Sequence, residues 1–327
     1  MPISSLVKSV IPSPLRHRVR DLLAPRRIRQ WPGDAQIPWF DRPDALQQLE
    51  NRRRAENLSA EDCDLLTRWV TDGYCVAEGI IPGCLIDAMV VDLNSLWTMD
   101  QPFAGLDFCD LRFGHNAPQP KTSHAELLGL TPAARLEAKN KSNWRIHSFQ
   151  TYSAGAKAIF NHPEMARLAS LILNRRAMPQ GSINFEYGSG QDAHQDTAVF
   201  HVYPANYIVG AWIACEDISI DCGPLMFYPE SHRAGWFSKF DNYPQTNLRT
   251  ASPEMAQAYR EHINDLTQKY ERRLFLGKKG DVFFWHGMML HGGSEINVPS
   301  LTRKSFVIHY MPKGANVEGR VVGPFNW

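Results

Sequence analysis

Two histidines and an aspartate in the second half of the chain have the types and spacing of a metal site. His194 and Asp196 are separated by one residue, and His291 follows much later in the sequence. In an extended strand, residues two apart point to the same side, so both members of the His-x-Asp pair can reach one metal. Two imidazoles and one carboxylate on one face of Fe(II) leave its other positions open for a cosubstrate and dioxygen.

A cationic group with a nearby hydroxyl follows the distal histidine. Arg303 carries a planar, permanently charged fork that binds a carboxylate through two hydrogen bonds. Ser305 lies two residues on, so in a strand its hydroxyl points the same way. The pair suits the far carboxylate of a dicarboxylate cosubstrate such as 2-oxoglutarate. A surface salt bridge is the alternative role for Arg303.

Other histidines compete for these roles. His201, His286 and His309 also lie in strand-like runs. His286 is the main competitor as the distal ligand, but the Leu290-His291-Gly292 context and the spacing to Arg303 favour His291. We expect the others to be core or rim histidines, and His232 to brace a turn. Taken alone, the His-x-Asp tripeptide also fits a loop histidine beside a solvated aspartate.

An ordered set of short motifs surrounds these residues. In chain order they are Gly188-Ser189-Gly190-Gln191, Ala211-Trp212-Ile213-Ala214, Cys222-Gly223-Pro224-Leu225, Tyr228-Pro229-Glu230-Ser231-His232, the run 280–286, Leu290-His291-Gly292-Gly293-Ser294 and Thr302-Arg303-Lys304-Ser305. The set resembles the phytanoyl-CoA dioxygenase family of Fe(II)/2-oxoglutarate oxygenases over roughly residues 60–312. Glu230 replaces the family's usual glycine. The Gly292-Gly293 pair is one residue longer than usual, so Gly293 and Ser294 both remain candidates for the family's serine position.

The resemblance implies a mainly β protein with flanking helices (α+β), built on a double-stranded β-helix, the cupin-like jelly roll. It implies Fe(II) bound by His194, Asp196 and His291, and 2-oxoglutarate bound by Arg303 with Ser305. Further candidates for the cosubstrate pocket are Trp212, Ser294, Asn184 and Gln180. Some relatives place an upstream lysine on the cosubstrate, for which Lys141 is the nearest candidate. If Arg303 is not the carboxylate anchor, Lys141 or Arg145 is next in line.

The implied reaction uses dioxygen to hydroxylate an aliphatic carbon of a small molecule, with release of succinate and carbon dioxide. The substrate class stays open among natural products, sugar-bearing molecules and acyl compounds. The candidate pocket aromatics are Phe200, Tyr203, Tyr207, Trp236 and Phe237. Two other functions remain as alternatives: a non-catalytic jelly-roll binding module, and a Zn(II) hydrolase that uses the same triad.

The spacing of apolar residues and the positions of turn-forming residues divide the chain into two parts. Residues 1–58 are predicted to be a basic N-terminal arm and linker, and residues 59–327 a single oxygenase domain. Within the domain we expect a helical preface (59–178) and a jelly-roll core (179–315) with an insertion at 233–275 that acts as a lid. The β-prone runs are 183–187, 194–201, 207–216, 225–228, 281–285 and 305–310. Residues 101–145 are loop-rich and give no clear prediction.

Composition sets further bounds. The chain has 327 residues, 43% apolar content and a formal net charge of +1, which gives no electrostatic case for nucleic-acid binding. The six cysteines form no C-x-x-C pair, and we expect reduced thiols and a cytoplasmic protein. The basic, leucine- and valine-containing first 30 residues suit a peripheral contact with a membrane or a partner, or a packed arm.

Overall fold

The computed structural model describes residues 36–114, 116–240, 248, 250–317 and 320–322. The basic first 30 residues, predicted to contact a membrane or a partner, therefore lie outside the described residues. Within them, no helix combines the length and apolar character needed to cross a membrane.

Two antiparallel sheets form a jelly roll, as the sequence predicts. The large sheet has eight strands in the order β1-β10-β7-β12-β5-β4-β2-β3, and the smaller one has the order β11-β8-β9. The large-sheet bounds are β1 Tyr74–Ala77, β10 Val282–His286, β7 Val209–Ala214, β12 Ser305–Pro312, β5 Ala177–Phe185, β4 Arg145–His147, β2 Asp107–Cys109 and β3 Thr122–Ser123. The smaller sheet comprises β11 His291–Gly293, β8 Leu225–Phe227 and β9 Arg273–Phe275. A further small sheet joins β14 Arg320–Val321, β13 Asn316–Val317 and β6 Val202–Tyr203.

Strand β12 shows how alternation divides the core. Phe306, Ile308 and Tyr310 are fully buried in the cluster that joins the large sheet to the helices. Val307 points to the other side, into the cluster between the two sheets. Phe227 of the smaller sheet meets Phe283 of the large sheet there, with ring centroids 4.7 Å apart. One face of the large sheet is thus a helix-packed core, and the other faces the interior of the barrel.

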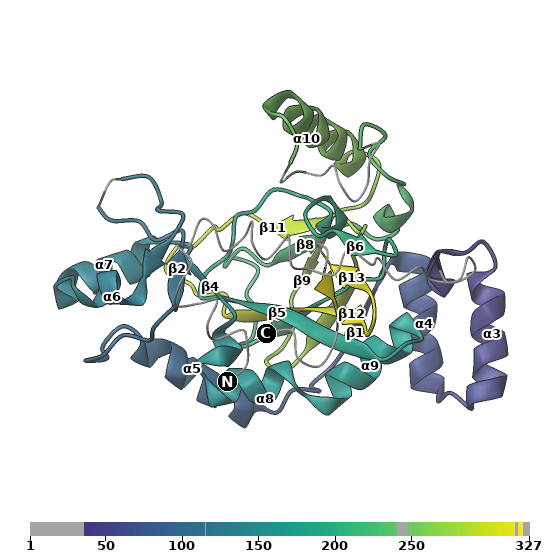
Figure 1. Cartoon of the computed structure of the whole chain (residues 1–327), viewed down its shortest axis with the longest axis horizontal. Coiled ribbons are helices and arrows are strands. Elements are labelled where there is room, and N and C mark those ends of the chain that lie inside the picture. The colour runs from purple at the N-terminus through teal and green to yellow at the C-terminus, as the bar shows by residue number, and fades with distance from the viewer. Residues whose placement is uncertain (1–35, 115, 241–247, 249, 318–319, 323–327) are drawn as a thin grey trace.

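Helices cover the outer face of the large sheet. Figure 1 shows α4 (Ala60–Asp72), α5 (Gly83–Ser95), α8 (Ala154–Phe160) and α9 (Pro163–Leu173) along this side, away from β11 and β8. Helix α4 begins after Ser59, whose hydroxyl accepts the Asp62 N–H, and ends at Gly73 (φ 82°).

Two predictions for the first half of the chain need correction or completion. The described part of the expected linker, up to residue 58, is ordered: η2 (Trp39–Asp41) and α3 (Ala45–Glu56) pack on the preface, and Phe40 lies 5.6 Å from Trp69 in an edge-to-face contact. The segment is rich in proline, aspartate and arginine, which led to the linker prediction, but its aromatic residues Trp39 and Phe40 are buried. The unassigned stretch 101–145 holds β2, β3, α6 (His124–Leu128) and α7 (Pro132–Lys141).

The prediction of a strand over 194–201 is wrong. His194 forms a single antiparallel bridge with His291, and the chain then turns into η4 (Asp196–Ala198). The Asp196 carbonyl accepts the N–H groups of Val199 and Phe200, and this turn ends the extended run. Gln195 itself stays extended (φ −112°, ψ 131°), so His194 and Asp196 can still point to the same side, as predicted for the His-x-Asp pair.

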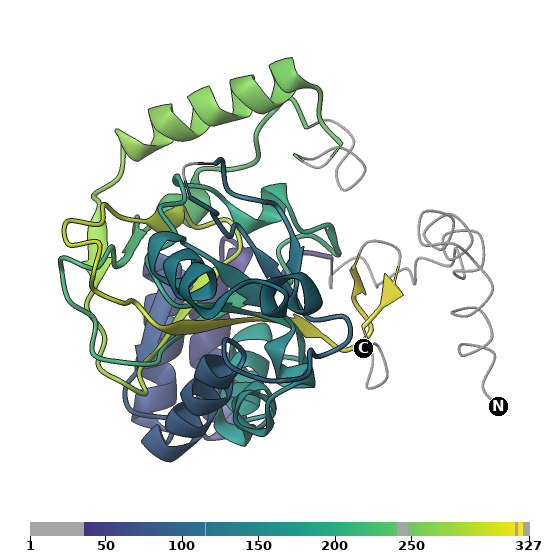
Figure 2. The ribbon, with the colours of Figure 1, turned by 90° about the vertical axis from the view of Figure 1, so that its left-hand side faces the viewer.

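The insertion contains α10 (Pro253–Thr267), which stands at the edge of the molecule above the smaller sheet (Figures 1 and 2). A third apolar cluster attaches it to the barrel. This cluster comprises Ala198, Tyr228, Phe237, Phe240, Tyr259, Ile263, Leu266 and Leu290. Ala198 and Leu290 flank the metal-site residues Asp196 and His291 in sequence, so the insertion packs directly behind the candidate site.

Candidate active site

His194, Asp196 and His291 converge on one point inside the barrel. One candidate ligand atom from each lies within 4.8 Å of the others. The two histidines meet through their backbones: each N–H donates to the other's carbonyl, at 3.0 and 3.2 Å, and the ring centroids are 4.5 Å apart. Gln195 points away and donates its side-chain amide to the Met288 carbonyl. The structure therefore brings the predicted triad together from two distant segments, with Asp196 at the start of η4, His194 two residues before it and His291 on β11.

Hydrogen bonds fix the orientation of both imidazoles. Nδ1 of His194 lies 2.9 Å from the Asp192 carbonyl, and Nδ1 of His291 lies 3.0 Å from the Met289 carbonyl. A carbonyl only accepts, so each Nδ1 carries the proton and donates. Each Nε2 is thereby left with a lone pair for a metal, as is typical of histidines that bind metals.

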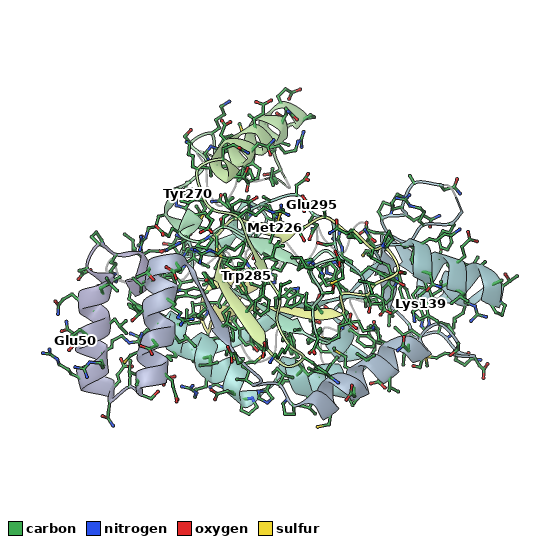
Figure 3. All side chains as sticks on the ribbon, turned by 180° about the vertical axis from the view of Figure 1, so that it is seen from behind. Glu50, Lys139, Met226, Tyr270, Trp285 and Glu295 are labelled. Atoms are coloured by element: carbon green, nitrogen blue, oxygen red, sulfur yellow. The ribbon has the colours of Figure 1, made fainter. Side chains whose placement is uncertain are left out.

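The Asp196 carboxylate is held through one of its oxygens. Oδ2 accepts the indole N–H of Trp285 at 2.9 Å and lies 3.1 Å from Nε2 of His309. Oδ1 has the looser contact, 3.8 Å from Nε2 of His291. The arrangement leaves Oδ1 as the oxygen best placed to bind a cation. Trp285 is close to the middle of the molecule (Figure 3).

The protonation states also suit metal binding. Burial acts to raise the pKa of Asp196, but the nearby imidazoles of His309 and His291 outweigh it and hold this pKa well below its usual range. Burial lowers the pKa of His291 to about 4. At neutral pH the site therefore presents a carboxylate and a neutral imidazole, the forms that coordinate metals.

The triad lines a cavity of about 400 Å³ that also contains Arg303 and Trp212. Phe185, Leu225 and Val307 contribute apolar walls. Cavities of this size that combine apolar walls with a few convergent polar groups are typical small-molecule sites.

Arg303 is a buried cation with unused donors. Its side chain is 2% exposed, and Nη1 donates to the Gly223 carbonyl at 3.1 Å. Its guanidinium carbon lies 5.7 Å from the Phe185 ring and 5.8 Å from the Trp212 ring. Nε of Arg303 and the hydroxyl of the buried Ser305 have no hydrogen-bond partner among the described residues. Burial lowers the pKa of Arg303 to about 10, so it stays charged at neutral pH.

Several other predicted site residues lie elsewhere. Asn184 is on the helix-facing side of β5, where its amide contacts Met89 of α5, because alternation turns it away from its cavity-lining neighbours Ile183 and Phe185. The Ser294 hydroxyl donates to the Pro224 carbonyl and stabilises the turn. Lys141 pairs with Glu137 in an exposed helical salt bridge. The structure places these three side chains away from the cavity.

Arg145 and Gln180 are closer to the predicted positions. Arg145 lines the main cavity and forms a 3.1 Å salt bridge with Asp110. Gln180 lines a smaller adjoining cavity rather than the main one.

His286, the competing distal ligand, is not part of the triad. It is fully buried on the other side of the sheet, where Nε2 lies 3.1 Å from Oδ1 of Asp41. Its Nδ1 accepts the Met288 N–H, and its ring is 5.3 Å from that of His232. These two histidines form a structural cluster behind the barrel, consistent with the expected core role.

Of the predicted pocket aromatics, Phe200 alone lines the main cavity among the described residues, and its ring packs against His309 at 4.6 Å. Phe237 is buried in the cluster of the insertion, and Trp236 lines a separate cavity beside Asp41. Tyr203 and Tyr207 also lie outside the cavity lining.

Sequence reasoning missed three residues that contact the metal-site segment. Trp285 and His309 hold Asp196, and Tyr259 of α10 accepts the Gln195 N–H at 3.2 Å, between two triad residues. A signal existed for His309, because it lies four residues after Ser305 in one strand and so on the same face. The roles of Trp285 and Tyr259 depend on contacts between distant segments and have no local signature.

Comparisons with known proteins agree with this geometry. The family model for phytanoyl-CoA dioxygenase (PhyH) matches residues 69–304. The rat phytanoyl-CoA dioxygenase domain-containing protein 1 is 25% identical over 193 residues, which cover 55% of this chain and 60% of that protein. The match thus spans less than two thirds of the length of this curated relative.

Two solved structures share the fold. The epimerase SnoN in complex with Fe³⁺, alpha ketoglutarate and nogalamycin RO has a TM-score of 0.54 at 15% identity, over 79% of this chain and 86% of SnoN. EctD from S. alaskensis with bound Fe has a TM-score of 0.51 at 16% identity, over 90% of this chain and 83% of EctD. At these identities the likeness establishes the jelly-roll architecture.

Proposed function

The chain belongs to the phytanoyl-CoA dioxygenase family, and from this premise we propose that it is an Fe(II)- and 2-oxoglutarate-dependent dioxygenase. Its reaction is the hydroxylation of an aliphatic carbon of a small molecule, with release of succinate and carbon dioxide. One observation carries the proposal: three convergent metal-binding side chains share a cavity with a buried arginine that has an unused donor.

The donor set fits Fe(II). Two imidazoles with free Nε2 atoms and one ionised carboxylate are the ligands that ferrous iron takes in oxygenases, and they leave positions open for other ligands. The fixed Nδ1–H donors of His194 and His291, and the bonds from Trp285 and His309 to Asp196, orient all three ligands in advance.

The other end of the cavity fits a carboxylate. A buried guanidinium is costly to desolvate unless it is paired, and a buried hydroxyl without a partner is also unfavourable. A carboxylate bound against Arg303, which lines the cavity, would pair with the guanidinium, and the buried Ser305 hydroxyl lies two residues further along the chain. The distal carboxylate of 2-oxoglutarate is such a group, which supports this molecule as the cosubstrate.

The chain's own residues supply binding, orientation and exclusion of water. When bound, Fe(II) and 2-oxoglutarate provide the oxidising chemistry. Arg303 and Ser305 fix the cosubstrate, while Trp285 and His309 keep Asp196 ionised and in place. The apolar walls formed by Phe185, Trp212, Leu225 and Val307 exclude water from the reacting atoms.

The test is turnover of 2-oxoglutarate labelled at C1, with oxygen uptake measured in parallel. The Fe(II)-loaded wild-type protein should release labelled carbon dioxide and form succinate, and the Asp196→Ala variant should not. Screening a metabolite panel for faster release would identify the substrate. Oxygen-independent activity with Zn(II) would instead support a hydrolase, and the absence of both metal binding and turnover would support a binding module.

A further inference from the structure

A smaller cavity adjoins the main cavity next to the triad. This side cavity has a volume of about 230 Å³ and shares His147, Ile183, Phe200 and His309 with the main cavity. His309 also contacts Asp196, so the two cavities meet beside the metal-binding residues. A molecule bound next to the metal site can therefore extend into the side cavity.

The side cavity lies opposite the arginine end of β12. Ser305 begins this strand and Arg303 precedes it by two residues, whereas His309 and Met311 are near its other end. At about 3.3 Å per residue, Ser305 and His309 are roughly 13 Å apart along the strand. Under the proposed function, on which this inference rests, the cosubstrate extends from the triad toward Arg303. The space toward His309 and Met311 then remains for the substrate.

A β-bulge shapes this space. Ser182 pairs with Ile308 and Pro179 pairs with Tyr310, so two residues of β5, Gln180 and Gly181, oppose the single residue His309. A bulge of this kind re-aims side chains locally and is frequent beside active sites. It explains why Gln180 lines the side cavity although strict alternation would turn it toward the helices.

Gly181 lines the side cavity and places no side chain in it. A Cβ atom built at this position meets no other atom within 4 Å. Its backbone φ is outside the left-handed region, so the conformation itself does not require glycine. Glycine therefore matters at this position because it lacks a side chain, and this leaves additional volume in the side cavity.

The lining of the side cavity carries no permanent charge among its described residues and includes two histidines, His147 and His309. Its described residues include no lysine, arginine, aspartate or glutamate, whereas Ile183, Phe200 and Met311 provide apolar surface. The Gln180 amide nitrogen donates to the carbonyls of Met178 and Pro179, and its oxygen has no hydrogen-bond partner among the described residues. The site can thus accept a hydrogen bond, and it offers an ionic group no carboxylate, ammonium or guanidinium as a partner to compensate for lost hydration.

We propose that the side cavity binds the part of the substrate remote from the oxidised carbon. That part is uncharged and partly apolar, and it carries a hydroxyl or amide N–H that donates to the side-chain oxygen of Gln180.

The test uses fluorinated fragments and protein loaded with Mn(II) and 2-oxoglutarate. The panel pairs neutral alcohols and amides with carboxylate and amine analogues of the same shape. Enhanced ¹⁹F relaxation by Mn(II) reports binding near the metal. Neutral members should bind the wild-type protein, and Gly181→Leu should weaken them by at least about tenfold while 2-oxoglutarate affinity changes by less than about twofold. Gly181→Ala should give a smaller loss, and Gly83→Leu, at an exposed position on α5, should give none.

Gln180→Leu gives the second measurement. It should weaken the hydroxyl and amide members and spare fragments that lack a donor. The proposal is overturned if no fragment binds, if ionic members bind as well as neutral ones, or if Gly181→Leu has no effect. Failure to bind Mn(II) and 2-oxoglutarate at the outset would instead contradict the proposed function itself.

Discussion

Trp285 donates its indole N–H to Oδ2 of Asp196 across 2.9 Å, and this bond decides which carboxylate oxygen is left for a metal. Gly210, paired with Trp285 on the neighbouring strand, makes room for the ring: a Cβ there would lie 2.1 Å from a Trp285 ring atom. The support for the carboxylate therefore depends on a close approach between β7 and β10.

We predict that Trp285→Phe weakens Fe(II) binding by about 10- to 100-fold, the usual effect of removing a hydrogen bond to a metal ligand. An anaerobic Fe(II) titration measures it. Trp97→Phe is the matched control, because Trp97 is also buried but its indole N–H has no partner among the described residues. Equal affinities in wild type and Trp285→Phe would show that the bond does not orient Asp196.

We predict that Arg303→Met raises the dissociation constant of 2-oxoglutarate by about 30- to 1000-fold, equivalent to roughly 2–4 kcal/mol for a charge-assisted bidentate pair. Fe(II) binding should be unchanged, because Arg303 does not contact the triad. Calorimetry with Mn(II)-loaded protein measures the 2-oxoglutarate affinity, and an anaerobic Fe(II) titration measures metal binding. If 2-oxoglutarate still binds normally, the carboxylate anchor is another residue, and Arg145 in the same cavity is the next candidate.

We predict that Tyr259→Phe weakens Fe(II) binding by roughly three- to tenfold, since a neutral hydrogen bond contributes about 1 kcal/mol. The lost bond holds the Gln195 N–H between two triad residues. Tyr228→Phe is the control, because Tyr228 belongs to the same cluster but its hydroxyl does not bond the 194–196 segment. If both variants have the same effect, or neither has any, the hydroxyl of Tyr259 does not position the ligands.

We predict that His232 makes the protein less stable in acid. Burial, with smaller contributions from His286 and Arg233, lowers the pKa of His232 to about 3. The unfolded chain then binds a proton that the folded chain does not, and stability falls as pH drops below the unfolded pKa of about 6.5. By pH 4 the loss should reach about 3 kcal/mol, and His232→Gln should remove this part of the pH dependence. Urea unfolding of both proteins at pH 7 and pH 4 measures this loss. An equal loss of unfolding free energy in the wild type and in His232→Gln would contradict the prediction.

The sequence predicts the triad and Arg303 because these residues have distinctive chemistry at distinctive spacing. The jelly roll follows from short β-prone runs bounded by turn residues. The partners of Asp196 were missed because strand order and register, which involve contacts between distant segments, bring Trp285 and His309 to it. Gln180 was linked to the pocket, but the bulge that turns it there is visible only in the strand pairing.

The insertion shows a similar limit. Its aromatic start predicted a lid, and the structure adds that Phe237 and Phe240 pack on Tyr259. The backbone N–H of Leu248 donates to the Ala198 carbonyl, and Leu248 lines the main cavity. A closing movement of the insertion remains a prediction, and trimming residues 236–245 while measuring product formation against succinate release would test it.

The most direct test of the metal and cosubstrate assignment is an anaerobic spectroscopic titration of the protein with Fe(II) and 2-oxoglutarate. The wild-type protein should develop a weak visible charge-transfer band only when both are present. Asp196→Ala should not develop it, because the substitution removes the only anionic side chain of the triad. A wild-type protein without the band, or an Asp196→Ala variant that shows it at unchanged affinity, would contradict the account.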